Sequence, residues 1–261
     1  MKKDASCLLC YPANYRITNK SNKFYNKVDY TIALNQYNKY INYLIENDVK
    51  PVFIDITKSS KQVYAKDIAF IIEDMLFISK MSLKERQEEI EPIKKLVFEE
   101  KLNHYIMQNN IEGGDVAVGD KVVFVGVSSR TNLKAIEELS EIVKQQDIEK
   151  EVIPINFDNS KLHLDCVFSL LGEDSALVSP YVYDREIVEK YIKNIIEITK
   201  EEADNFATNL VYLGNNKLVT SNISVGNKLN KLGYNAEVID YSEIVKGDGS
   251  VDCSTLALLR E

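Results

Sequence analysis

The chain has 261 residues, of which 45% are hydrophobic and 28% are charged, and its formal net charge is −8. This composition is typical of a globular protein with a substantial core. An acidic chain without a basic block argues against a nucleic-acid partner, and no apolar stretch approaches the roughly 20 residues that a membrane helix needs. We therefore expect a cytoplasmic protein whose partner is a small molecule, attracted more readily if it is a cation.

Helical and strand-like periods alternate along the whole chain. In chain order, the expected elements are a strand at 7–17, a helix at 30–47, a strand at 49–55, a hairpin at 66–79, a helix at 82–109, a hairpin at 113–126, a helix at 131–146, a strand at 151–157, a hairpin at 163–179, a helix at 184–199, a hairpin at 207–221, a helix at 224–232, a strand at 234–240 and a last strand at 251–259. The helix at 82–109 is expected to begin at Ser82, with Glu85 completing a capping box and Pro92 kinking or dividing it.

One pattern repeats through these elements: a polar residue, a hydrophobic run, a tight turn and a second hydrophobic run. The first residues of the copies, here called the anchors, are Asp67, Asp115, Asp165, Asn209 and Cys253, and they lie 44 to 50 residues apart. Such a period predicts repeated copies of one supersecondary unit, here strand, turn, strand, helix and strand.

A unit of this kind cannot bury both faces of its sheet alone, so neighbouring units must cover it. We expect five units to close in a ring, giving a five-bladed α/β propeller that forms one domain over residues 1–261. The strand at the beginning of the chain would complete the last blade, so the two ends should meet. A kelch-like propeller, which lacks helices, and a doubly wound sheet, which has fewer hairpins, are the alternatives.

In a closed ring the anchors would gather at one end of a central channel. Only two histidines are present, and His163 is close to an anchor whereas His104 is expected within a helix, at the surface or in packing. On a strand, His163 and Asp165 would share a face, which favours the imidazole as a general acid or base. Cys166 would then point to the opposite face, into the core.

Two further segments supply candidate residues to the channel. The turn-rich lead to Cys253 would hold an exposed bend beside the channel. Gly113 and Gly114 have no hairpin turn to make, so we expect them to let the backbone approach a ligand closely and to present Glu112 to it. The motif formed by Cys7 and Cys10 lies in a strand-like run, and a redox or metal role is left open beside the interpretation as a buried strand. The four cysteines are expected to be reduced.

Together the channel would hold a thiol, an imidazole and several carboxylates. A planar cation with several N–H donors, such as guanidinium, fits that set because carboxylates bind it in a bidentate manner. Clustered carboxylates also suit a metal ion, but the spacings of common metal motifs are missing. We therefore expect no metal and no cofactor.

At these residues the chain resembles the guanidino-group modifying superfamily, the penteins, which includes arginine deiminases, dimethylarginine dimethylaminohydrolases and amidinotransferases. The segments that carry the resemblance are IEGGDV at 111–116, FVGVSSRTN at 124–132, LHLD at 162–165 and DGSVDCSTL at 248–256. The resemblance implies Cys253 as the nucleophile, His163 as the acid/base and Glu112 as a catalytic carboxylate. It also implies substrate binding by Asp67, Asp115, Asp165 and Arg130, with Arg130 on the substrate carboxylate.

The resemblance implies hydrolysis of the guanidino group of arginine or of an N-methylated arginine to citrulline, through a covalent intermediate on sulfur. Asp165 gives an H-x-D segment as in arginine deiminases and amidinotransferases, whereas the length and the SSRTN and DCSTL segments are closer to the dimethylaminohydrolases. The segment CYPANYRI is similar to one found in arginine dihydrolases, which continue to ornithine, although Tyr11 replaces a proline. An amidinotransferase, an arginine dihydrolase and a non-enzymatic binding propeller remain alternatives, and a homodimer is left open.

Overall fold

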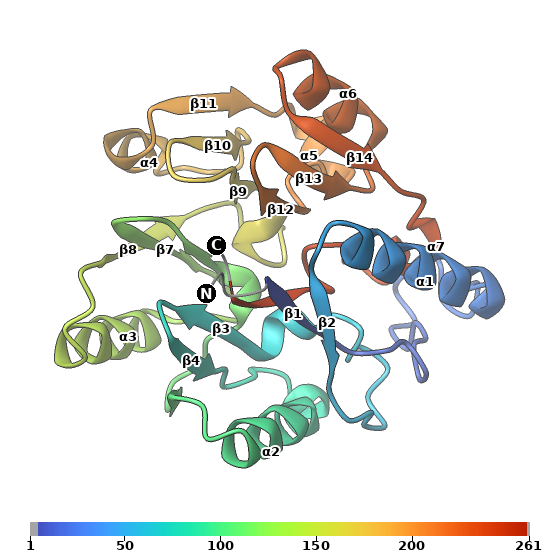
Figure 1. The fold of residues 1–261 in the computed structure, drawn as a ribbon, viewed down its shortest axis with the longest axis horizontal. Coiled ribbons are helices and arrows are strands. Elements are labelled where there is room, and N and C mark those ends of the chain that lie inside the picture. Colours follow the sequence, from blue (N-terminus) through green and yellow to red (C-terminus); the bar gives the residue numbers. More distant parts are fainter. Residues whose placement is uncertain (1–4, 260–261) are drawn as a thin grey trace.

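Five small sheets lie around a common centre in the computed structural model, which describes residues 5–259 (Figure 1). From inner to outer strand they are β3 (Ala69–Ile72), β4 (Met75–Ile78) and β5 (His104–Ile106); β6 (Val116–Val118), β7 (Val122–Val127) and β8 (Glu151–Asn156); β9 (Phe168–Leu170), β10 (Ser175–Val178) and β11 (Asn194–Glu197); β12 (Leu210–Gly214), β13 (Lys217–Thr220) and β14 (Asn235–Val238); and β15 (Leu256–Leu259), β1 (Ser6–Leu9) and β2 (Lys50–Phe53). This arrangement confirms the predicted five-bladed α/β fold.

Every sheet is built in the same way. The inner strand pairs antiparallel with the middle strand, and the outer strand pairs parallel with the middle strand. A parallel pair needs a crossover, and a helix supplies it in each sheet. These helices are α1 (Tyr30–Glu46), α2 (Glu91–Glu99), α3 (Leu133–Gln145), α4 (Arg185–Tyr191) and α6 (Ile223–Lys231). Among the described residues two shorter helices, α5 (Lys200–Asp204) and α7 (Ser242–Val245), precede the inner strands β12 and β15.

The ring closes where the two ends of the chain meet. In β1, Cys7 is paired with Ala257 and Leu8 with Leu256 of β15, in an antiparallel register. The fifth sheet therefore takes its inner strand from the end of the described chain and its other two strands from the beginning, as the sequence predicted. Residues of β15 also contact β3 of the next sheet, which links the closing blade to its neighbour.

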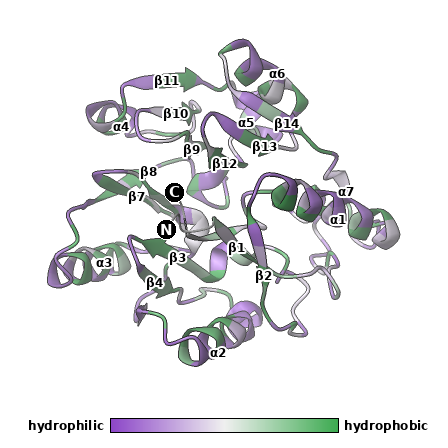
Figure 2. Ribbon diagram, viewed as in Figure 1, coloured by the Kyte–Doolittle hydropathy of each residue, from purple (hydrophilic) through white to green (hydrophobic). Residues whose placement is uncertain are grey.

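The crossover helices cover the outside of the ring with one apolar face each. In α3, for example, Ala135, Ile136 and Leu139 are buried, and the side chain of Asn132 caps the first turn by accepting from the backbone N–H of Ala135. Hydropathy alternates around α1, α3 and α6, whereas hydrophobic residues run along β3 and β7 (Figure 2). The helices thus bury one stripe against the sheets and leave the other to solvent.

The core is formed between blades as well as within them. One cluster joins Phe70 and Phe77 of the β3–β4 hairpin to Val123 and Val125 of β7 in the next sheet, with Leu139 of α3 closing it from outside. Each sheet therefore depends on its neighbour for part of its burial, and a closed ring is the arrangement that gives every sheet a neighbour.

Two predicted helices end earlier than expected, and a short strand follows each. The helix predicted at 82–109 is a 3₁₀ helix, η2 (Lys84–Ile90), then α2, and then β5, so the prediction that His104 lies within a helix is wrong. The helix predicted at 184–199 is α4 followed by β11. Both strands are only three or four residues long. Their backbone N–H and C=O groups bond to β4 and β10, whereas in a longer helix the same groups would have bonded within the helix.

The anchors do not lie on strands. Asp67, Asp115 and Asp165 lie in 3₁₀ helices just before the inner strands, namely η1 (Ala65–Ile68), η3 (Gly113–Asp115) and η4 (Leu164–Cys166). Asn209 directly precedes β12, and Cys253 lies in the turn that leads to β15. The prediction that His163 and Asp165 share one face of a strand is therefore wrong, because the chain coils between them.

The motif formed by Cys7 and Cys10 is buried, and both thiols are free. Burial raises the pKa of each thiol to about 12, with the charge of Glu89 adding to the effect at Cys10. A thiol of this kind is poorly ionised at neutral pH, which is unfavourable for redox chemistry and metal binding. The structure therefore favours the interpretation as a buried strand.

Candidate active site

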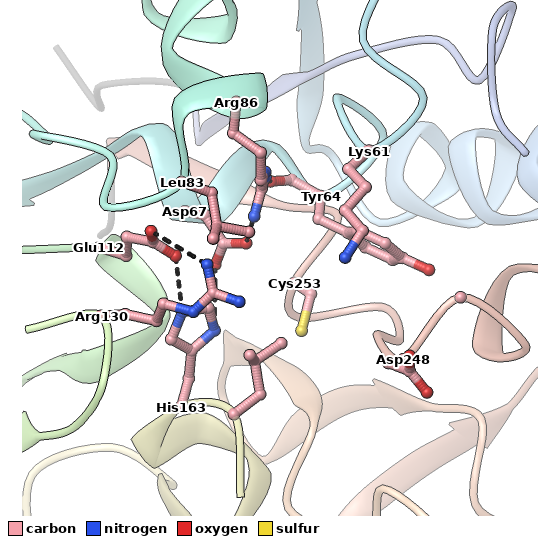
Figure 3. A pocket seen from close by; sticks show the side chains of 12 residues that line it. Lys61, Tyr64, Asp67, Leu83, Arg86, Glu112, Arg130, His163, Asp248 and Cys253 are labelled. Carbon is pink, nitrogen blue, oxygen red and sulfur yellow. Dashed lines mark hydrogen bonds and ion pairs between the residues drawn. The ribbon is translucent and has the colours of Figure 1, made fainter. Parts of the chain in front are cut away.

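One cleft opens where the turns before the inner strands come together (Figure 3). The helices η1 and η3 contact each other, as do η3 and η4, so residues far apart in the sequence meet there. Counted out to the surrounding solvent, the cleft encloses about 340 Å³. The lining residues are Lys61, Tyr64, Asp67, Leu83, Arg86, Glu112, Arg130, Leu162, His163, Gly247, Asp248 and Cys253.

His163 is held between two carboxylates on the inner wall of the cleft. Its Nε2 lies 2.9 Å from Oε2 of Glu112, and its Nδ1 lies 3.5 Å from Oδ1 of Asp67. Burial by itself lowers the pKa of this imidazole, but the charges of Asp67 and Asp115 and the hydrogen bond to Glu112 outweigh burial and raise the pKa to about 10. At neutral pH the ring is therefore an imidazolium that can donate a proton.

Glu112 is fully buried, and both of its carboxylate oxygens are hydrogen-bonded. Its Oε1 accepts hydrogen bonds from the backbone N–H and the hydroxyl of Ser82, at 3.1 and 3.0 Å. Burial raises the pKa of the carboxyl, but the hydrogen bond and charge of His163, followed by the charges of Arg86 and Arg130, lower it to about 2. Ser82 therefore holds Glu112 instead of capping a helix, which corrects the predicted capping box.

Only one oxygen of Asp67 accepts a hydrogen bond, and the other faces Nδ1 of His163 at 3.5 Å. Its Oδ2 accepts from Arg86 at 2.6 Å, and Arg86 is bound in turn by Glu89, with Nη2 to Oε2 at 2.7 Å. All three side chains are buried. The other oxygen of Asp67, Oδ1, is buried without a hydrogen-bond partner in the described part of the chain. A buried acceptor without a donor is unfavourable, so this oxygen is suited to an N–H group of a ligand in the cleft.

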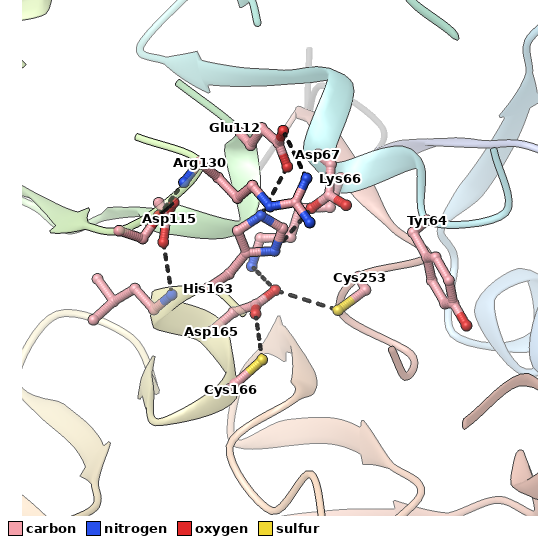
Figure 4. Close-up of polar contacts among 12 residues, drawn as sticks. Tyr64, Lys66, Asp67, Glu112, Asp115, Arg130, His163, Asp165, Cys166 and Cys253 are labelled. Carbon is pink, nitrogen blue, oxygen red and sulfur yellow. Dashed lines mark hydrogen bonds and ion pairs between the residues drawn. The ribbon is translucent and has the colours of Figure 1, made fainter. Parts of the chain in front are cut away.

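Cys253 faces the cleft from a turn that Asn209 holds in place, and Figure 4 shows its sulfur directed toward Asp165. The side-chain Oδ1 of Asn209 accepts from the backbone N–H of Asp252 and Cys253, while its Nδ2 donates to the sulfur at 2.9 Å. The thiol donates to Oδ2 of Asp165 at 3.4 Å. Burial raises the pKa of the thiol well above its ordinary value, and the charge of Asp165 adds to that effect.

Behind the sulfur, Asp165 is part of a second buried network. Its Oδ2 lies 3.7 Å from Nζ of Lys66, which also pairs with Asp252, and its Oδ1 accepts from the thiol of Cys166 at 3.5 Å. Burial raises the pKa of Asp165, against the opposing charge of Lys66. Cys166 itself packs in the core, as predicted, but from a 3₁₀ helix and not from a strand.

Gly113 and Gly114 allow neighbouring turns of the propeller to pack closely. A Cβ on Gly113 would lie 2.1 Å from the carbonyl oxygen of Lys66, and one on Gly114 would lie 2.6 Å from Nδ1 of His163 and 2.8 Å from Oδ1 of Asp67. The prediction that these glycines leave room for a ligand is therefore corrected. They leave room for the neighbouring turn and for the imidazole.

Of the seven predicted site residues, the structure brings five to the cleft: Asp67, Glu112, Arg130, His163 and Cys253. Asp115 and Asp165 do not line it. Asp115 is fully buried and accepts from the hydroxyls of Ser128 and Thr131 and from the backbone N–H of Leu164, so its geometry is that of a structural residue. Burial raises its pKa to about 6 despite the charge of His163.

Arg130 lies deep in the cleft, beside the carboxylates. Its Nη1 is 3.9 Å from Oε1 of Glu112 and 3.4 Å from the hydroxyl of Ser82. The predicted contact with a substrate carboxylate stays a prediction, because the guanidinium here points toward the inner acids (Figure 3).

A metal ion has one candidate ligand set in the described residues. Oxygens of Asp67 and Glu112 and a nitrogen of His163 lie within 4.8 Å of one another. Metal binding needs a neutral imidazole, and the raised pKa of His163 means that an ion would have to displace a strongly held proton. The set is better described as an imidazolium between two carboxylates.

Sequence reasoning missed four cleft and positioning residues: Lys61, Arg86, Asn209 as a holder of the sulfur, and Asp248. Arg86 lies in the charged segment KERQEE, which has the composition of a solvated helix face. Asn209 did carry a signal, because it occupies the anchor position of its repeat.

Known proteins resemble this chain in sequence and in fold. The profile of the family described as N,N dimethylarginine dimethylhydrolase, eukaryotic, matches residues 13–260. The uncharacterized protein YkgA of Bacillus subtilis is 30% identical over 97% of this chain and 91% of its own length. The N(G),N(G)-dimethylarginine dimethylaminohydrolase of Pseudomonas aeruginosa is 25% identical over 94% and 96%. Among solved structures, the product-bound N-terminal domain of ArgZ, an arginine dihydrolase from cyanobacteria, has a TM-score of 0.87 at 22% identity and covers 99% of this chain and 98% of its own. That likeness shows the pentein fold.

Proposed function

Because the chain belongs to the N,N-dimethylarginine dimethylhydrolase family, we propose that it hydrolyses the guanidino group of arginine or of an N-methylated arginine. The products would be citrulline and ammonia or an amine. The proteins of known activity among its relatives are hydrolases that act on C–N bonds of linear amidines, in agreement with the predicted enzyme class.

The observation that carries the proposal is Oδ1 of Asp67, which accepts no hydrogen bond from the described residues. It lies in a cleft that also contains the thiol of Cys253 and the imidazolium of His163, whose Nδ1 is 3.5 Å away. A bound guanidinium would supply an N–H group to this oxygen and so place its central carbon between sulfur and ring. An uncharged amide offers fewer donors and no charge to the same carboxylates.

The proposed first step is attack by the sulfur of Cys253 on the guanidino carbon. A C–S bond forms, and the C–N bond to the departing nitrogen breaks as the imidazolium of His163 donates its proton to that nitrogen. The thiol must first lose its own proton, and the acceptor it already contacts is Oδ2 of Asp165, at 3.4 Å.

In the second step the neutral imidazole of His163 takes a proton from water, and the resulting hydroxide attacks the carbon of the thiouronium intermediate. A C–O bond forms, the C–S bond breaks, and the departing sulfur of Cys253 takes the proton of the new hydroxyl, so that the neutral ureido product and the thiol result. The proton held by Asp165 passes to the solvent. Glu112 keeps the ring oriented and favours its charged form in both steps, since it is bonded to Nε2.

Substrate binding should itself promote ionisation of the thiol. Carboxylates near Cys253 disfavour a thiolate in the empty cleft, whereas a guanidinium cation close to the sulfur favours it. The same cation would lower the pKa of His163 and so ease proton release to the leaving nitrogen.

The structure weakens one argument about substrate choice. The H-x-D segment favours unsubstituted nitrogens only if Asp165 faces the substrate, but Asp165 lies behind the sulfur and pairs with Lys66. Arginine and its methylated forms therefore remain alternatives that only an assay separates.

The test is incubation of the purified protein with arginine, monomethylarginine, dimethylarginine, agmatine and citrulline, with products identified by mass. Citrulline from arginine or a methylated arginine is expected. Ornithine would instead indicate a dihydrolase, and a new guanidino compound formed when glycine or lysine is added would indicate an amidinotransferase. If no guanidino compound is consumed, the proposed function is wrong.

A further inference from the structure

Three charged side chains lie behind the nucleophile and outside the lining of the cleft. They are Lys66, Asp165 and Asp252. The ammonium group of Lys66 pairs with Asp252 and lies 3.7 Å from Oδ2 of Asp165. The three side chains are between 4% and 17% exposed, so little solvent screens their charges. This cluster can therefore act on Cys253 without facing the cleft.

The backbone of Lys66 is fixed against the turn that carries the nucleophile. Its N–H donates to the carbonyl oxygen of Cys253 at 3.0 Å. Its own carbonyl oxygen packs so closely against Gly113 that a Cβ there would lie 2.1 Å away. Figure 4 shows the ammonium group on one side of the Asp165 carboxylate and the sulfur of Cys253 on another. The side chain of Lys66 thus enters behind the sulfur from a fixed point.

One oxygen of Asp165 faces both the ammonium group and the thiol. Oδ2 accepts from Sγ of Cys253 at 3.4 Å and lies 3.7 Å from Nζ of Lys66. The other oxygen, Oδ1, accepts from the thiol of Cys166 at 3.5 Å. In the proposed first step Oδ2 takes the proton of Cys253, which it can do only while the carboxyl is ionised.

The ionised state of Asp165 depends on Lys66. Burial raises the pKa of this carboxyl, and the charge of Lys66 is the largest effect in the opposite direction. The charges of Asp252 and Asp67 raise the same pKa, and the charge of His163 lowers it. Burial also lowers the pKa of Lys66, but the charges of Asp252 and Asp165 outweigh burial and raise it, so the lysine stays charged.

Transfer of the proton within this cluster leaves its total charge unchanged. While Cys253 is a thiol, two carboxylates and one ammonium group leave one negative charge in excess. After the proton has moved to Asp165, the sulfur and Asp252 are negative, Lys66 is positive, and the excess is the same. Without Lys66, the two buried acids would share a proton, because neighbouring buried carboxylates do not readily ionise together. The thiol would then have no acceptor.

We infer that Lys66, held in place by Asp252, is a positioning residue for the proton transfer that activates Cys253. It keeps Oδ2 of Asp165 available as the acceptor, and it acts from behind the sulfur without lining the cleft. This role rests on the proposed function, since it belongs to the first step of that reaction. Removal of the lysine charge should therefore slow the reaction in a way that depends on pH, whereas a purely structural defect should slow it equally at every pH.

The test compares Lys66→Met with the wild type in the turnover of arginine and of dimethylarginine from pH 6 to pH 9. We expect kcat to fall by about 10- to 100-fold at pH 7 with little change in KM, because Lys66 does not line the cleft. The pKa of Asp165 is higher without the lysine, so the ionised fraction of the acceptor grows as the pH rises. The ratio of kcat in the variant to kcat in the wild type should therefore increase with pH, by up to about tenfold per pH unit.

Three further variants complete the comparison. If Lys66→Met does not fold, Lys66→Gln makes the same test, because its amide can still hydrogen-bond to the acids. Lys66→Arg keeps the charge and should recover most of kcat. The matched control is Lys95→Met, which removes an exposed lysine from its ion pair with Asp55 and should leave kcat unchanged at every pH. Melting temperatures verify that each variant is folded.

Three outcomes would overturn the inference while the proposed function stands, because wild-type turnover is measured in the same assay. They are a kcat ratio that stays constant with pH, a loss confined to KM, and full activity of the folded variant without the charge. If Lys66→Arg is as slow as Lys66→Met, the charge is not what the reaction needs, and the inference is again overturned. If the wild type consumes neither arginine nor dimethylarginine, the proposed function is wrong and the inference with it.

Discussion

The two sides of the cleft differ in whether their ionisable groups have neighbours of opposite charge. On the imidazole side, His163 lies between Glu112 and Asp67, and every charge has an opposite charge within about a hydrogen-bond length. On the thiol side, Cys253 is bonded to an amide and to Asp165, so the thiolate that the proposed mechanism requires would form beside a carboxylate.

This difference in charge pairing explains how the site can stay unreactive without a ligand. The pKa of His163 is raised to about 10, and that of Cys253 is raised well above its ordinary value of 9.0, so a neutral solution contains an imidazolium and a thiol. Neither is a nucleophile or a base in that state. A substrate cation is the missing charge for the thiol side.

The largest effect is expected from removal of the sulfur. Cys253→Ser should lower kcat/KM by at least about 10⁴-fold, because a hydroxyl in the same position is ionised far less readily than a thiol. The hydrogen bond from Asn209 should still hold the turn, so the melting temperature should change little. If the variant keeps more than about a tenth of the wild-type kcat/KM, the nucleophile is another residue, and the contrast between the two sides of the cleft no longer holds.

The second test removes a paired charge from the imidazole side. Arg86→Met leaves Asp67 and Glu89 buried without their cation and should destabilise the protein by about 3–5 kcal/mol, measured by urea unfolding. The matched control is Arg185→Met, which breaks exposed ion pairs and should cost about 1 kcal/mol or less. Equal losses in the two variants would contradict the view that the inner network is tightly coupled.

The third test displaces the imidazole without removing it. A methyl group on Gly114 would lie 2.6 Å from Nδ1 of His163, so Gly114→Ala should shift the ring and lower kcat by about 10- to 100-fold. Gly119→Ala is the control, since its methyl group would meet the carbonyl oxygen of Val122 at 3.2 Å and side-chain carbons of Val122 and Leu170 at 3.4 and 3.5 Å, and neither residue lines the cleft. If both variants are fully active, the position of the ring is less restricted than the structure implies.

The fourth test follows stability with pH. The folded state holds the proton of His163 up to about pH 10, whereas an unfolded chain releases it near 6.5, so the folded state binds more protons between these values. Stability from this group is complete below pH 6.5 and is lost as the pH rises toward 10, with a slope of up to about 1.4 kcal/mol per pH unit. In His163→Gln that slope should be absent, and urea midpoints at pH 7, 8 and 9 measure it. An equal slope in both proteins would show that the imidazole is not the titrating group.

The ring could be predicted from the sequence because its period is long and regular. The anchors, their spacing and the strand shared by the two ends follow from residues that repeat, and the structure confirms that arrangement. The strands β5 and β11 could not be predicted in the same way. They are too short to show a period of two, and the apolar residues of α2 and α4 run into them.

The site could be predicted in part, for reasons that particular residues make clear. Glu112, His163 and Cys253 are unusual residues at anchor positions or beside them. Asp115 has the same position as Asp67 in its repeat, but in the folded chain its oxygens bind two hydroxyls and a backbone N–H, so sequence register alone does not tell a structural carboxylate from one that faces the cleft.

The pairing of β15 with β1 has a consequence for how activity arises during synthesis. The turn that carries Cys253 directly precedes β15, and the partner strand of β15 is made first. In a nascent chain the residues of the imidazole side are made early, but the sulfur of Cys253 reaches the cleft only when β15 pairs with β1 and closes the fifth sheet. Under the proposed mechanism, incomplete translation products should therefore at most bind guanidino compounds, without reacting with them.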